Sequence, residues 1–597
     1  MTAAAVAIRA RAERLRVAVS ADALALGGLA VFSLGLLALV WGTWGDLDSD
    51  TGYDLVAGIR MADGEVLYRD LTYFYGPLAP ALAALAVLAG GPSVGSAVAL
   101  GLVVAGAIVL GTYALARTLV EPLGAFLAAA LTAAVALIPN NYSFVIPHTH
   151  AATLGTLGLL AMLLCAYRYA QSARTSWLVL AGASIGVVAL TKPEPLVAGA
   201  VAAGLWLVLR AFAGARFRRE ALLLTAPALA IPAVVYGAFA AVAGARTLVL
   251  ENLYPVDFLD AAGNAMLENR MPMTASSFAE VGGKLALYVA GCAGLVLVGA
   301  RIAKGGRVGR LLVAACVVGG LLFLVGALVK PDGLRDGMYY LYGWIPAGAV
   351  IALALLVRRY RRRDGAWTPQ QQVELTTAAV LAVLAFTTYA SFVVHGWRPQ
   401  MAVYYLPFAA VLLARLHLVE LARSRPAYVL GVVWLAFLAG AAAGLTLKDA
   451  RAESATVRGS GGSLAEAPAE AALYQSALDA ISARTQPGEP ILVAPLMTGL
   501  YPLSERKSPL PELSLLPGAL SSRADERAAI ARLEEAGVRL AITDNREWPG
   551  YGHTSFGESF DRELARWIEA NFNHAATIRA PGDADRKLDV WLKRRVP

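Results

Sequence analysis

Apolar runs long enough to cross a membrane recur up to residue 448 and constrain the fold more than any other feature. A transmembrane helix needs about 20 mainly apolar residues. The chain is also 58% hydrophobic and only 16% charged, against roughly 45–50% and 25% in soluble domains. We therefore predict an α-helical polytopic membrane protein with about thirteen transmembrane helices. The expected spans are 23–40, 95–116, 123–139, 150–167, 177–191, 195–209, 221–243, 283–300, 311–329, 340–357, 373–394, 402–414 and 427–447.

Lysine and arginine are distributed unequally between the turns that join these spans. The N-terminal segment and the turns on its side carry 23 of these bases, whereas the opposite loops carry nine. Because basic residues accumulate on the cytoplasmic side, the pattern predicts a multi-pass protein of the cell (inner or plasma) membrane. Its N-terminus is expected in the cytoplasm and its C-terminus outside. The net charge of +8 follows from this topology, so no nucleic-acid partner is expected.

The composition changes after the last apolar run. Residues 1–448 are predicted to form the membrane domain, and 449–597 are polar. Helical patterns alternate there with short strand-like stretches, which is typical of an α/β domain. We expect helices over 466–484, 523–536 and 557–571, and strands over 491–496, 538–543, 576–580 and 588–592. The Gly- and Ser-rich segment 454–463 is predicted to be a linker. The expected role of this extracytoplasmic domain is structural or acceptor-docking.

The first outer loop, residues 45–96, is the most informative part of the membrane domain. Seven carboxylates and two arginines lie between Asp46 and Asp70. Two stretches, 53–62 and 77–88, are too short to span and are predicted to be juxtamembrane helices. Carboxylates just outside a membrane helix can accept a proton from a hydroxyl nucleophile or hold a divalent cation against a phosphate. A solvated acidic loop is the plain alternative.

The order of motifs in this loop favours a functional site over a solvated acidic loop. Asp48 and Asp50 are followed by the amphipathic stretch, then Gly64, then Tyr68-Arg69-Asp70, and then Tyr75-Gly76-Pro77-Leu78. This order resembles the first outer loop of the GT-C superfamily of membrane glycosyltransferases. It is most similar to the branch with lipid A aminoarabinose transferases and protein O-mannosyltransferases. Leu190-Thr191-Lys192, at the outer end of the fifth span, resembles a second signature of that branch.

The Ala-, Gly- and Arg-rich composition is typical of GC-rich bacteria, so a bacterial cell-envelope enzyme is expected. The resemblance implies an inverting glycosyltransferase that moves a hexose or pentose from a polyprenyl-phosphate donor to an acceptor hydroxyl on the outer face. The acceptor is a glycan, a lipid or a protein. Asp50 is the expected general base, and Asp48 is either the alternative base or a neighbour that raises the pKa of Asp50. Lys192 is expected to neutralise the departing lipid phosphate, unless it is only an interfacial anchor.

Other residues are candidates for binding substrate. Arg60, Arg69 and Asp70 have the charge to orient donor or acceptor, and Tyr68, Tyr75 and Glu194 belong to the family-like motifs. Each also has a structural interpretation, as do His148 at the start of the fourth span and Arg398 in a later outer loop. The metal requirement stays open, because Phe74 and Tyr75 stand where aminoarabinose transferases have a Glu-Lys pair that includes a metal ligand. No other cofactor is predicted.

Two other function classes compete with this interpretation. One is a flippase or transporter of lipid or sugar. The spans contain almost no ionisable groups and no evident inverted repeat, and transporters normally have such features. The other is a non-catalytic assembly protein of the cell envelope, whose outer domain binds a wall component. Transfer of a labelled sugar distinguishes the enzyme from both.

Overall fold

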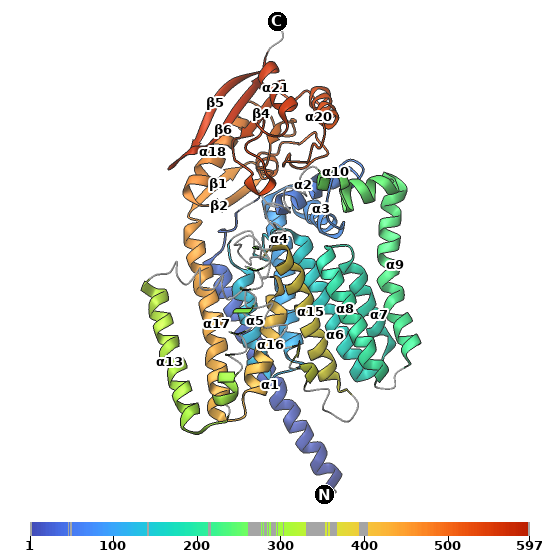
Figure 1. The fold of residues 1–597 in the computed structure, drawn as a ribbon, viewed down its shortest axis with the longest axis vertical. Coiled ribbons are helices and arrows are strands. Elements are labelled where there is room, and N and C mark those ends of the chain that lie inside the picture. The colour runs from blue at the N-terminus through green and yellow to red at the C-terminus, as the bar shows by residue number, and fades with distance from the viewer. Residues whose placement is uncertain are drawn as a thin grey trace.

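A bundle of long helices carries an α/β domain at one end in the computed structural model of this protein (Figure 1). The structure describes residues 3–45, 47, 50–139, 143–212, 216–260, 367–392 and 404–594, together with parts of the segment 276–358 that include 304–329. Asp48 and Arg398 lie outside these residues, as does most of the expected span 340–357.

The predicted helical membrane region is confirmed. Among the described residues, six helices are long and apolar enough to cross a membrane, and three apolar helices are shorter. The total of about thirteen stays a prediction. The long helices are the apolar part of α1 (Ala3–Leu39), with α4 (Val94–Ala116), α6 (His150–Ser172), α8 (Pro193–Phe212), α9 (Phe217–Ala243) and α17 (Arg425–Ala452). The shorter ones are α3 (Leu78–Gly90), α5 (Pro122–Ala136) and α7 (Thr175–Val188).

Small residues let these helices pack closely. A Cβ atom added at Gly182 on α7 would collide with the backbone of Leu224 on α9, and one at Gly101 on α4 would collide with Val145. Close backbone approach is how membrane helices gain van der Waals contact when burial of apolar surface offers no advantage. The remaining helices of the bundle are α13 (Gly306–Val329), α15 (Pro369–Phe392) and α16 (Leu406–Arg415).

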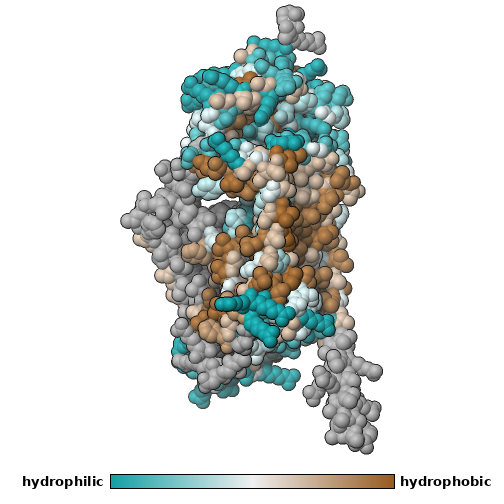
Figure 2. Space-filling view, turned by 90° about the vertical axis from the view of Figure 1, so that its right-hand side faces the viewer, coloured by the Kyte–Doolittle hydropathy of each residue, from teal (hydrophilic) through white to brown (hydrophobic). Residues whose placement is uncertain are grey.

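The surface has the hydropathy of a membrane protein. Hydrophobic side chains gather in a band around the middle of the face in Figure 2, and hydrophilic ones cover both ends. Exposed large apolar residues such as Val103, Leu222 and Val234 belong to the long helices. Such a wide apolar surface would favour aggregation in water, so it indicates contact with lipid.

Both predicted juxtamembrane helices are present in the outer loop. α2 (Asp50–Ala62) and α3 (Leu78–Gly90) pack against each other. They lie at the end of the bundle that carries the α/β domain, opposite the N-terminus (Figure 1). The π-helical segment η1 (Thr247–Leu253) and the short α10 (Val256–Phe258) follow α9.

The C-terminal region is the α/β domain that the alternating pattern predicted. A four-stranded sheet has the order β3-β4-β6-β5, with β3 and β4 parallel and the other pairs antiparallel. Its strands are β3 (Leu492–Ala494), β4 (Leu540–Asp544), β5 (Phe572–Ala580) and β6 (Asp583–Lys593). The helices of the domain are α18 (Pro468–Ser482), α19 (Leu500–Ser504), α20 (Arg523–Glu535) and α21 (Arg562–Asn571).

The predicted linker is wrong. Residues within 454–463 instead contribute to an antiparallel hairpin of β1 (Ala455–Gly459) and β2 (Gly462–Glu466). Val457 pairs with Leu464, and both side chains are buried. The glycines serve close packing, because a Cβ atom at Gly459 or Gly461 would collide with the backbone of α19. Helix α17 therefore leads directly into ordered structure.

Candidate active site

A buried carboxylate anchors α2 to the membrane helices. The side chain of Asp54 is fully buried and accepts hydrogen bonds from the hydroxyl of Tyr73, from Thr149 Oγ1 at 3.2 Å and from the backbone N–H of His150 at 2.8 Å. His150 Nδ1 lies 3.4 Å from the same carboxylate. Thr149 also caps the N-terminus of α6. Asp54 thus joins α2, the loop after it and the start of α6.

The loop after α2 is fixed by tyrosines that stay protonated. Burial, with the Asp54 carboxylate adding to it, raises the pKa of Tyr73 well above its usual value. Burial also raises the pKa of Tyr68 well above its usual value. The Tyr68 hydroxyl donates to the carbonyl of Tyr75 at 2.6 Å. Tyr68 also has φ of +68°, a conformation rare for a bulky residue. Both phenols therefore act as hydrogen-bond donors at neutral pH.

Asn252 on η1 connects a distant segment to this loop. Its Oδ1 accepts from the backbone N–H of Tyr73 at 2.8 Å, and its Nδ2 donates to the carbonyl of Thr247 at 2.9 Å. The residue is buried. A buried amide with partners for both ends rigidifies its surroundings, so the loop position depends on residues far along the chain.

The two family-like motifs lie side by side. The backbone N–H of Gly76 donates to the carbonyl of Thr191 at 2.7 Å, and that of Leu78 donates to Leu190 at 3.0 Å. A Cβ atom on Gly76 would collide with the Leu190 backbone. The Lys192 ammonium consequently lies 4.5 Å from the centre of the Tyr75 ring, within cation–π range. One oxygen of Glu194, Oε2, is buried without a hydrogen-bond partner among the described residues.

Of the two expected bases, only Asp50 lies within the described residues. Asp50 is the first residue of α2, one turn before Asp54, and Asp48 precedes it outside the described residues. Their roles as base remain predictions. Arg398, proposed to bind substrate from a later loop, also lies outside the described residues.

The arginines of the outer loop contact protein groups. Arg60 is buried, pairs with Glu65 at 2.6 Å and donates to the carbonyl of Leu510 in the α/β domain. Arg69 and Asp70 form an exposed bidentate pair, which lowers the pKa of the Asp70 carboxyl. Asp70 also accepts from the backbone N–H of Val66. These contacts give the Tyr-Arg-Asp motif a definite part in loop structure, and substrate binding by these residues remains a prediction.

His148 and His150 lie at the start of α6, and each contacts another part of the chain. The backbone N–H of His148 donates to the Tyr404 hydroxyl at 2.9 Å, and His150 is buried beside Asp54. No group of three or more His, Cys, Asp or Glu side chains within the described part of the chain could hold a metal ion. The metal requirement therefore stays open.

The anchoring residues Asp54 and Asn252 were not predicted from the sequence. Asp54 was counted among the acids of the loop, although its place on the predicted helix 53–62, close to Asp50 in the sequence, could have drawn attention to it. Asn252 had no such signal. Its partners come from another part of the chain, and no spacing rule relates them.

Comparison with known proteins agrees with the motifs. Residues 75–236 match the family of dolichyl-phosphate-mannose-protein mannosyltransferases. The matched segment includes Tyr75, Lys192 and Glu194 and begins after Asp50. The match over residues 75–236 supports the predicted resemblance to the GT-C superfamily of membrane glycosyltransferases. No curated protein sequence matches the chain.

Two solved structures similar to this chain hold a lipid phosphate. One is the archaeal oligosaccharyltransferase AglB from Archaeoglobus fulgidus, in complex with an inhibitory peptide and a dolichol-phosphate, at 14% identity and a TM-score of 0.45. The alignment covers 96% of this chain and 75% of that one. The other is ArnT from Cupriavidus metallidurans bound to undecaprenyl phosphate, at 14% identity and a TM-score of 0.44, covering 94% and 98%.

Proposed function

We propose that this protein is an inverting glycosyltransferase that uses a polyprenyl-phosphate sugar on the outer face of the membrane. One observation carries the proposal: the Tyr75–Leu78 segment is hydrogen-bonded to Leu190 and Thr191, so that Lys192 lies against Tyr75 beside the acidic outer loop. The family matched by residues 75–236 is named for a polyprenyl-phosphate sugar donor. A cation near the membrane surface suits the phosphate of such a donor.

The chemistry needs a base and a cation. The acceptor hydroxyl oxygen forms a bond to the anomeric carbon while the bond from that carbon to the phosphate oxygen breaks. The phosphate leaves with the electron pair, and the hydroxyl proton passes to a carboxylate. We assign the carboxylate to Asp50, with Asp48 as its neighbour, and the stabilisation of the leaving phosphate to Lys192. The identity of the sugar and of the acceptor (glycan, lipid or protein) remains open.

The proposed activity is tested by transfer in detergent. Purified protein is incubated with a radiolabelled polyprenyl-phosphate sugar and a membrane extract as the acceptor source. The expected result is label in a new product together with free polyprenyl phosphate. A transporter or an assembly protein would leave the glycosyl–phosphate bond intact. Persistence of intact donor, across hexose and pentose donors, would therefore contradict the proposal.

Lys192 gives the first prediction on the site. Lys192→Ala should lower kcat/KM for the donor roughly 10²-fold, because removing one preorganised charge contact costs about that much. Lys192→Arg should recover part of the loss, and KM for the acceptor should change little. Lys587→Ala, in an ion pair on β6, serves as the control lysine. Normal donor kinetics for Lys192→Ala would reduce Lys192 to an interfacial anchor.

Action on the outer face requires a defined topology. The α/β domain lies at the same end of the bundle as α2 and α3 (Figure 1), and the bases of the opposite turns predict that this end is outside the cell. A phosphatase reporter fused after Pro597 should therefore be active. If only a reporter that works in the cytoplasm gives signal at this position, the predicted orientation is wrong.

A further inference from the structure

The α/β domain contacts the chain before and after the expected catalytic carboxylates, Asp48 and Asp50. The turn between β3 and α19 lies against Leu47, which is fully buried. Thr498, also buried, donates from its Oγ1 to the carbonyl of Leu47 at 3.0 Å. Leu47 is the residue immediately before Asp48. The backbone leading into the Asp48–Asp50 segment is thus held by a hydroxyl from the α/β domain.

The packing at this contact leaves no room for side chains. A Cβ atom on Gly499 would lie 2.6 Å from the Cβ of Leu47. One on Gly52 would collide with the Leu47 carbonyl and with Thr498, and one on Gly45 would collide with β2. Positions 45, 47 and 52 are therefore each in close contact with the C-terminal region. In the sequence, they flank Asp48 and Asp50 on both sides.

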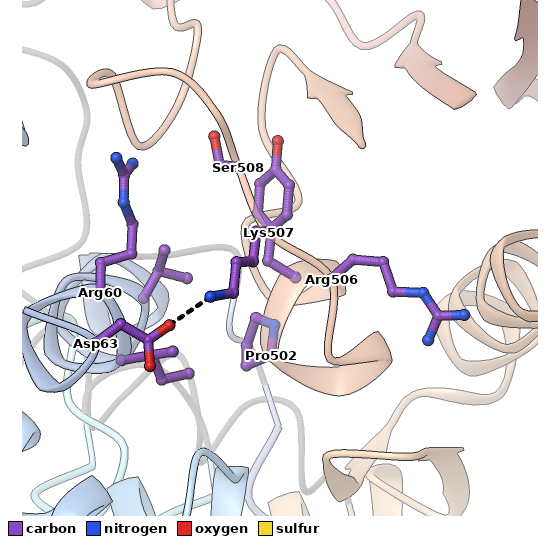
Figure 3. Close-up of a pocket in the computed structure, with 9 residues that line it drawn as sticks. Arg60, Asp63, Pro502, Arg506, Lys507 and Ser508 are labelled. Atoms are coloured by element: carbon purple, nitrogen blue, oxygen red, sulfur yellow. Dashed lines mark hydrogen bonds and ion pairs between the residues drawn. The ribbon is translucent and has the colours of Figure 1, made fainter. Parts of the chain in front are cut away.

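The contact continues along the whole of α2. The hydroxyl of Tyr53 donates to Ser514, Arg60 donates to the carbonyl of Leu510, and Lys507 pairs with Asp63 at 2.6 Å. Figure 3 shows the far end of this interface, where Lys507 points from the domain toward Asp63, the residue after α2, while Arg506 points away. Residues in the loop 507–514 therefore contact α2 near its first turn, in its last turn, and just after its end.

We propose that the α/β domain is a positioning element for the catalytic segment, and that Thr498 is its principal positioning residue. This inference rests on the proposed function. A general base must lie within hydrogen-bond reach of the proton it accepts. A displacement of about 1 Å can cost roughly 10²-fold in rate. In the sequence, Asp48 and Asp50 stand between the held positions 47 and 52, so loss of the Thr498 bond releases the backbone at Leu47, the residue before Asp48.

The test separates positioning from stability. Thr498→Val keeps the shape but removes the donor, and Thr498→Ser keeps the donor. Thr446→Val is a matched control, because the buried Thr446 Oγ1 donates to the carbonyl of Ala134 on another helix at 2.7 Å. For each variant, kcat, KM for the donor, and amide hydrogen exchange of a peptide covering residues 45–52 are measured in detergent.

We expect Thr498→Val to lower kcat roughly 10- to 100-fold with KM for the donor within about twofold, and to speed exchange in 45–52. Thr498→Ser should resemble the wild type, and Thr446→Val should keep both kcat and exchange in 45–52. Unchanged kcat in Thr498→Val, or an equal loss in Thr446→Val, would overturn the positioning role. Absence of transfer by the wild type would instead overturn the proposed function, and the exchange rates would still decide whether Thr498 holds the segment.

Discussion

Replacing Asp50 with Asn is expected to lower the single-turnover rate of sugar transfer by about 10²–10⁴-fold, which is the usual contribution of a general base. Asn is nearly isosteric with Asp but cannot accept the proton of the acceptor hydroxyl. Because Asp50 is the first residue of α2, Asn should also be tolerated there, since it is favoured at helix starts. Donor affinity, measured separately, should stay near that of the wild type.

Substitutions of two other carboxylates of the outer loop, Asp48 and Asp63, serve as comparisons. Asp48→Asn should cost less than Asp50→Asn if Asp48 only tunes the pKa of its neighbour, and more if Asp48 is itself the base. Asp63→Asn should be nearly neutral, because the Asp63–Lys507 pair is about half-exposed and such pairs contribute about 0–1 kcal/mol. Near-normal transfer by folded, donor-binding Asp50→Asn would remove Asp50 from the mechanism.

Asp54→Ala should have the largest effect on stability, lowering the free energy of unfolding by about 3–5 kcal/mol. The substitution leaves the Tyr73 hydroxyl, Thr149 Oγ1 and the backbone N–H of His150 without their buried acceptor. Unfulfilled buried donors cost about 1–3 kcal/mol each. Thermal unfolding in detergent should show a melting temperature several degrees below that of the wild type.

Asp63→Ala is the matched control for this effect, since it removes a half-exposed carboxylate from the residue that directly follows the same helix. Its melting temperature should lie close to that of the wild type. Tyr73→Phe should have an intermediate effect, because it removes one donor and leaves the other two paired with Asp54. Equal melting temperatures for Asp54→Ala and Asp63→Ala would show that Asp54 is not an anchor.

The fold was largely predictable where a periodic pattern reports on burial. The apolar runs indicated the long helices, the amphipathic stretch 53–62 indicated α2, and alternation after residue 449 indicated the α/β domain. The hairpin of β1 and β2 was not predicted, because its Gly- and Ser-rich sequence is also typical of a linker. Its glycines are explained by close contact with α19, which is a tertiary property.

The candidate site was only partly predictable. Tyr75 and Lys192 were identified from motifs, and the structure brings them together. The contacts that hold the loop come from residues 95–451 positions away, such as Thr149 to Asp54 and Thr498 to Leu47. Single hydrogen bonds between distant segments leave no spacing for a sequence to display. Asn252 and Thr498 therefore became visible only in the folded chain.

The stereochemistry of a single turnover tests the central claim most directly. Donor of known anomeric configuration is mixed with excess protein and acceptor, and both the product and the released polyprenyl phosphate are analysed. In-line attack on a polyprenyl-phosphate sugar predicts one equivalent of free polyprenyl phosphate and a product of inverted anomeric configuration. Retention of configuration, or donor bound without cleavage of its glycosyl–phosphate bond, would contradict the account.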